Sequence, residues 1–169
     1  MIPDIQLQLK SVAKSLKDNV LPAVDPNNEL AQQQIQLSIA TLEIALNNLP
    51  LIHSVLRKDI EQHLAMAEQI LATAIEQHSK KTLTQLSQKA AQVLADPQQG
   101  LTQLQHEARE LRAGIGETIA NNPDLTELEA IVFRFSETTV DLGRALNKPM
   151  GFEASPNDIR DVASLLNTP

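Results

Sequence analysis

The chain lacks cysteine, tryptophan and tyrosine altogether, and its 169 residues include only three phenylalanines. Without cysteine, a protein cannot form disulfides, thiolate zinc sites, iron–sulfur clusters or a cysteine nucleophile. Aromatic residues make up 2% of the chain, which leaves little for stacking nucleic-acid bases or for building an aromatic cage around a cation. We therefore expect an aliphatic core and none of these sites.

Long hydrophobic runs are also missing. The first 17 residues place Asp4, Gln6 and Lys10 among the apolar positions, unlike the continuous apolar segment of a secretory signal. No run approaches the roughly 18 apolar residues of a membrane-spanning helix. We expect no membrane span and a soluble, cytoplasmic protein.

Positive charge is scarce relative to negative charge. The chain has 14 Lys and Arg against 21 Asp and Glu, for a net charge of −7. Affinity for phosphate backbones comes mainly from clustered Lys and Arg, so we do not expect nucleic-acid binding.

Apolar residues recur at helical spacing in every stretch between the prolines. One stripe after Leu125, for example, consists of Leu128, Val132, Phe135, Thr139, Leu142 and Leu146. Short connections favour antiparallel neighbours. The sequence predicts an all-α fold, an up-and-down antiparallel bundle of about six helices with a short C-terminal helix. The expected helices cover 4–21, 28–48, 51–77, a segment capped by Ser79 that ends before Pro97, 98–120 and 125–147.

We expect a single domain, in which residues 1–147 form the bundle and 148–169 a docked tail. Ser155 and Pro156 have the composition of a helix start and predict the short C-terminal helix. Phe152 is a candidate anchor for this tail. The predicted helix 28–48 is apolar on two sides, which favours a central position. The predicted helix that Ser79 caps and the predicted helices 98–120 and 125–147 have one principal stripe each and should lie at the periphery.

Asp59 and His63 are one helical turn apart and point toward the same apolar arc. Such a carboxylate can orient an imidazole as a base or metal ligand, but an internal structural hydrogen bond, or a pair at the edge of the apolar stripe, is the simpler explanation. The chain contains no Glu-x-x-His, which argues against a ferritin-like dimetal site. We expect no metal and no cofactor. Gly114 and Gly116 lie within a helical pattern, which indicates close helix approach or a kink.

Two further surfaces are candidates for partner binding. Lys10, Lys14 and Lys17 form a basic ridge on the first helix, which could meet an acidic partner, a coenzyme A phosphate or a membrane surface, or simply face solvent. Phe133 and Val140 lie away from the main stripe of their helix. They form either an exposed patch for dimerisation or partner binding, or a second internal contact.

Residues 16–25 read LKDNVLPAVD. This segment resembles the opening of a small, uncharacterised bacterial all-helical family found near acyl-CoA dehydrogenase-like and aminoglycoside-phosphotransferase-like genes. In that family a first helix ends in a Val-Leu-Pro-Ala phrase before a longer second helix. The resemblance covers about the first third of the chain and implies an accessory role near acyl-CoA metabolism, with no site residue to carry over.

The leading functional hypothesis is a non-catalytic helical module that acts by protein–protein association, with itself or with a partner. The alternative is a bundle that binds an apolar ligand, such as an acyl chain or acyl-CoA, between the helices predicted second, third and sixth. A hydrolase that uses Asp59 and His63 is a third hypothesis.

Overall fold

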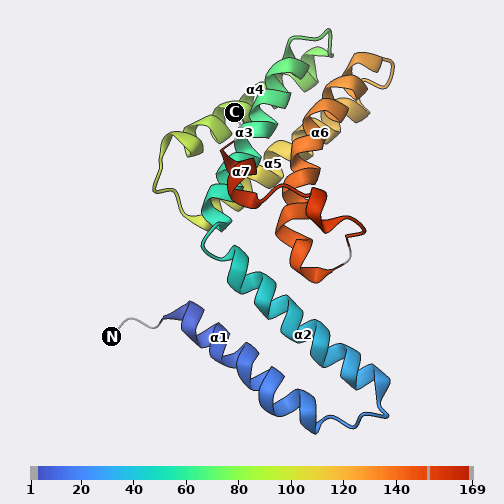
Figure 1. Cartoon of the computed structure of the whole chain (residues 1–169). Coiled ribbons are helices and arrows are strands. Elements are labelled where there is room, and N and C mark those ends of the chain that lie inside the picture. Colours follow the sequence, from blue (N-terminus) through green and yellow to red (C-terminus); the bar gives the residue numbers. More distant parts are fainter. Residues whose placement is uncertain (1–3, 152, 168–169) are drawn as a thin grey trace. The chain divides into compact units, whose positions relative to one another are not determined.

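The computed structural model describes residues 4–151 and 153–167, and every regular element in this part of the chain is helical. The predicted all-α fold is confirmed. Phe152 lies outside the described residues. The α-helices are α1 (Ile5–Ser15), α2 (Glu29–Asn48), α3 (Ile52–Leu71), α4 (Gln77–Ala95), α5 (Leu101–Ala120), α6 (Thr126–Asn147) and the short α7 (Val162–Leu166), as labelled in Figure 1.

The first two helices begin at side-chain caps. The Asp4 carboxylate accepts a hydrogen bond from the Leu7 backbone N–H at 2.9 Å, and the Asn28 side-chain oxygen accepts one from the Ala31 N–H at 3.1 Å. Each cap satisfies a backbone donor that has no partner within its own helix. Beyond α1 the chain continues through a π-helical turn (Leu16–Val20) and a 3₁₀ turn (Leu21–Ala23) that contains Pro22.

The boundary between α3 and α4 differs from the prediction, because α3 ends at Leu71, earlier than residue 77. Buried Ile75 occupies the connection, and the Glu76 backbone N–H donates to Asn122 Oδ1 at 2.9 Å. The prediction that Ser79 caps the next helix is wrong. Ser79 is buried in the first turn of α4, where its hydroxyl donates to Glu76 Oε1 at 3.1 Å.

The end of the chain is also less regular than predicted. Ser155 precedes only a 3₁₀ turn (Pro156–Asp158), and α7 begins later, at Val162. Ile159 and Leu165 are both buried, so apolar contacts fix this segment although its helical part is short.

The chain divides into two compact units, and α6 contributes to both. One comprises Met1–Leu51 and Gly143–Asp161, and the other Ile52–Leu142 and Val162–Pro169. We refer to them as the hairpin unit and the core unit. The expectation of a single domain stays a prediction.

The core unit contains the main apolar interior. Helices α3, α4 and α5 pack against one another (Figure 1). A Cβ atom on Gly114 of α5 would collide with Leu86 Cδ1 of α4, which confirms the expected close helix approach, whereas Gly116 faces open space. The fully buried large side chains are Ile60, Ile70, Leu83, Leu104, Leu111, Leu128 and Leu165.

The hairpin unit is built from α1 and α2, which pack against each other. Only Ile39 of α2 is buried, and Leu30 is 68% exposed, so the prediction that this helix is central is wrong. The central helices are α3 and α5, which bury six and seven residues, so the prediction that the helix over 98–120 is peripheral is also wrong. Helix α2 also contacts the 3₁₀ turn Lys148–Met150, and Asn48 Nδ2 donates to the Leu146 carbonyl at 3.2 Å.

Among the described helices, none alone has the length and hydropathy needed to cross a membrane. Helices α2 and α3 meet these criteria only when they are counted together across the break between them.

Candidate functional site

A groove between α1 and α2 has a volume of about 850 Å³. Its floor includes Ala13, which is buried, and Leu46, which is half-buried. Lys10, Lys14 and Lys17 all line it. The structure therefore brings the three predicted basic residues together along one side of a single groove, because residues at spacings of three and four share a helix face.

The acidic side chains at the groove do not neutralise all of its three lysines. Lys17 Nζ lies 3.8 Å from Glu43 Oε1 of α2, and both side chains are more than half exposed. The Asp4 carboxylate is occupied as the cap of α1. Lys10 and Lys14 are exposed and form no ion pair with any described residue. The groove is thus suited to an anionic group beside an apolar surface.

The outer face of α6 is a second surface that the core leaves open. Phe133 is 85% exposed and Val140 is 56% exposed. Glu129 and Glu137, each four residues from Phe133, are also exposed. On a helix these positions form one face. We call these four residues the acidic α6 face.

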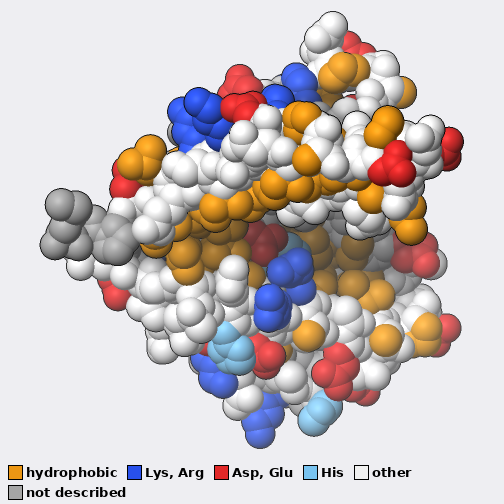
Figure 2. Space-filling view, turned by 90° about the horizontal axis from the view of Figure 1, so that it is seen from below, with side chains coloured by type: hydrophobic (Ala, Val, Ile, Leu, Met, Phe, Trp, Pro, Cys, Tyr) orange, Lys and Arg blue, Asp and Glu red, His pale blue; other side chains and the backbone are white. Residues whose placement is uncertain are grey.

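Large apolar side chains reach the surface elsewhere as well. On the hairpin unit they include Ile5 and Leu7, each 61% exposed, and Leu37, which is 45% exposed. In the space-filling view, apolar side chains reach the surface beside charged groups (Figure 2). An apolar surface bordered by charges is typical of a protein–protein contact.

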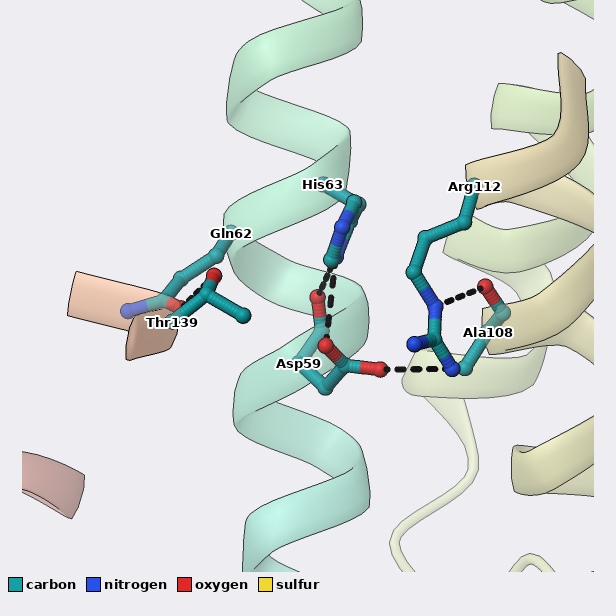
Figure 3. A network of polar contacts seen from close by, with 6 residues as sticks. All are labelled: Asp59, Gln62, His63, Ala108, Arg112 and Thr139. Atoms are coloured by element: carbon teal, nitrogen blue, oxygen red, sulfur yellow. Dashed lines mark hydrogen bonds and ion pairs between the residues drawn. The ribbon is translucent and has the colours of Figure 1, made fainter. Parts of the chain in front are cut away.

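Asp59 and His63 form an internal polar network (Figure 3). His63 is buried, and its Nδ1 lies 2.7 Å from the Asp59 carbonyl oxygen and 3.3 Å from Asp59 Oδ1. Asp59 Oδ2 lies 3.6 Å from Nη2 of Arg112, whose Nε donates to the Ala108 carbonyl at 3.1 Å. The carboxylate therefore orients the imidazole and links α3 to α5, the structural role that the sequence left open.

A hydrogen bond between Gln62 of α3 and Thr139 of α6, with an oxygen–oxygen distance of 3.4 Å, lies beside this network in Figure 3. No group of three or more His, Asp or Glu side chains within the described residues is placed to hold a metal ion. The geometry thus gives Asp59 and His63 a packing role, and their use in hydrolysis stays a hypothesis.

A smaller hollow of about 340 Å³ lies between α3 and α6, and no sequence pattern predicted it. Arg134 and Phe135 line it from α6, and Gln69 from α3. The Arg134 guanidinium lies 5.6 Å from the centre of the Phe135 ring and donates a hydrogen bond to Gln69. Gln69 lies 65 residues before Arg134, so no local pattern connects the two sides of the hollow.

Glu43 in the groove, and Glu129 and Glu137 on α6, were not predicted as site residues either. Glu43 becomes relevant only when α2 folds beside α1. The two α6 glutamates could have been found, since they lie one turn before and one turn after Phe133.

Comparison with known proteins finds no matching family model, no matching curated protein and no matching solved structure. The resemblance of residues 16–25 therefore stays a prediction.

Proposed function

We propose that the protein is a non-catalytic helical module that acts by association, with itself or with a protein partner. The observation that carries the proposal is the exposure of Phe133, which is 85% open to solvent on the outer face of α6. An exposed aromatic ring flanked by charges resembles the anchor residues of protein interfaces.

The polar side chains of the core unit support a non-catalytic role, because they bind other groups within the core unit and stabilise its packing. Asp59 holds both His63 and Arg112. Arg57 donates to the Leu94 carbonyl at 2.6 Å and to the Asp96 carbonyl at 2.9 Å, at the end of α4. Binding to the last carbonyls of a helix is a stabilising use of arginine.

Sedimentation velocity of the purified chain over a wide concentration range tests the proposal, combined with affinity capture from cells of its source. We expect either a concentration-dependent oligomer or one stoichiometric protein partner. Replacing Phe133 with Ala should weaken the association about tenfold or more, as expected for an interface anchor. A monomer at every concentration that also captures no stoichiometric partner contradicts the proposed function.

The groove between α1 and α2 supports a second candidate, binding of an amphiphile with an anionic head. Its volume of about 850 Å³ falls within the usual range for ligand sites, and Lys10 and Lys14 provide charge beside the apolar floor. This location differs from the one expected from the sequence, between the helices predicted second, third and sixth. Native mass spectrometry should show a co-purified lipid or thioester, and bare protein mass in repeated preparations contradicts this candidate.

A further inference from the structure

We propose that the acidic α6 face of one molecule docks into the α1–α2 groove of a second molecule. This inference rests on the proposed function of association and specifies its partner as another copy of the chain. It joins the two surfaces that the hairpin and core units leave open.

The charges of the two surfaces are complementary. Lys10 and Lys14 line the groove and form no ion pair with the described residues, while Glu129 and Glu137 on α6 are exposed. Opposite charges across an interface steer the encounter and select the register. Since the chain as a whole is acidic, with a net charge of −7, this local excess of lysine is the natural place for an acidic surface to bind.

The apolar parts can share the same contact. Phe133 and Val140 are seven residues apart on α6, which is about 10.5 Å at a rise of 1.5 Å per residue. The groove has apolar lining at Ala13 and Leu46, and docking places the Phe133 ring against this lining while the glutamates reach the lysines.

The openness of the groove favours a helix over a small molecule. Lys10, Lys14 and Glu43 on its sides are all exposed. A small ligand is normally buried over 70–90% of its surface, whereas an amphipathic helix needs only its apolar face covered.

The groove and the acidic α6 face are different surfaces, so the contact is heterologous. Such a contact either closes when copies exchange it reciprocally or around a ring, or continues into a longer assembly. Both forms depend on the same charges, and raising the ionic strength weakens both.

Paired charge reversals test the inference. One variant carries Lys10→Glu and Lys14→Glu, which gives it an acidic groove beside its acidic α6 face. The other carries Glu129→Lys and Glu137→Lys, which gives it a basic α6 face beside its basic groove. We expect each variant alone to associate about tenfold to a hundredfold more weakly than the wild type, because like charges then meet.

An equimolar mixture of the two variants should regain association, because each groove then meets a face of opposite charge. This recovery also shows that both variants are folded. Matched controls reverse the same number of exposed charges outside the two surfaces. Lys81→Glu with Lys89→Glu, and Glu68→Lys with Glu110→Lys, should leave the association of the otherwise unchanged chain within about twofold.

The possible failures are distinguishable by sedimentation velocity. If the wild type associates but the reversals have no effect, or the mixture fails to recover, the inference is overturned and the proposed function stands. A wild type that is monomeric but captures a different stoichiometric protein also overturns the inference alone. A wild-type monomer without any protein partner overturns both.

Discussion

Gly114 and Gly116 are two residues apart in α5 but have different surroundings. A Cβ on Gly116 meets open space, whereas one on Gly114 meets Leu86 of α4. In a helix, alanine is more favourable than glycine by about 0.5–1 kcal/mol. The sequence predicted a structural reason for these glycines, but only the position of Leu86 shows that it applies to Gly114.

We expect Gly116→Ala to raise the free energy of unfolding by about 0.5–1 kcal/mol, because it gains helix propensity without a clash. Gly114→Ala should gain less or lose stability, since the Leu86 side chain must move. Urea unfolding followed by circular dichroism measures both. Equal gains in the two variants would contradict a close approach at Gly114.

At the scale of the element, the hairpin unit depends on the cap of α2. The Asn28 side chain accepts the Ala31 N–H, and its removal leaves that donor without an intrahelical partner. We expect Asn28→Ala to destabilise the start of α2 by about 1 kcal/mol. Hydrogen exchange of the α2 amides measures the change.

The matched control for this cap is Gln33→Ala, which changes an exposed residue within the same helix and keeps the cap. It should leave the first-turn amides unchanged or better protected, because alanine favours helix. If both variants lose the same protection, the cap is not the cause.

The segment after α6 is held by a pair of hydrogen bonds between charged groups. Arg144 donates to Glu153 from Nε at 3.1 Å and from Nη2 at 2.9 Å. Hydrogen bonding from Arg144, aided by its positive charge, lowers the pKa of Glu153 below its usual value. The pair therefore stabilises the fold fully above the ordinary glutamate pKa, and this contribution is lost as the pH falls through the lowered value.

We expect Glu153→Gln to be less stable than the wild type near neutral pH, and the difference to shrink as the pH falls below about 4. Thermal unfolding at several pH values measures it. The control Glu61→Gln changes an exposed carboxylate of α3. A Glu153→Gln deficit that stays constant down to low pH would contradict a stabilising role for the ionised pair.

At the scale of the whole molecule, the two units differ in how much they bury. The buried hydrophobic residues of the hairpin unit are Ala13, Ile39, Ala145 and Ile159, whereas the core unit contains a continuous apolar cluster. Local opening is easiest where few apolar contacts are lost. The hairpin unit should therefore open more readily than the core unit.

Hydrogen exchange of the intact chain tests this difference. Amides of α3 and α5 should exchange slowest, and those of α1 and α2 fastest. Raising the protein concentration should slow exchange in α1, α2 and α6 if these helices form the contact between copies. Uniform protection across the chain at low concentration would contradict the difference between the units.

Most of the correct predictions about the fold came from local features of the sequence. The first helix was predicted to start at residue 4, where Asp4 caps α1, and the helical class followed from apolar spacing along each segment. The predicted central position of α2 was wrong. A second apolar stripe on a helix does not determine which element covers it, and here Leu30 and Leu37 are exposed. The two candidate surfaces could be predicted from the sequence as separate helix faces. The residues that surround each surface in the folded chain could not.

The sequence by itself determined that this chain forms helices, where most of them begin, and which residues share a face, because these properties depend on neighbours within a few positions. The tertiary structure decided that α3 ends before Ile75 and that α3 and α5 are central. It also decided that Glu43 faces Lys17 across a groove. These features depend on contacts between residues far apart in the chain, and helical periodicity carries no information about which faces meet.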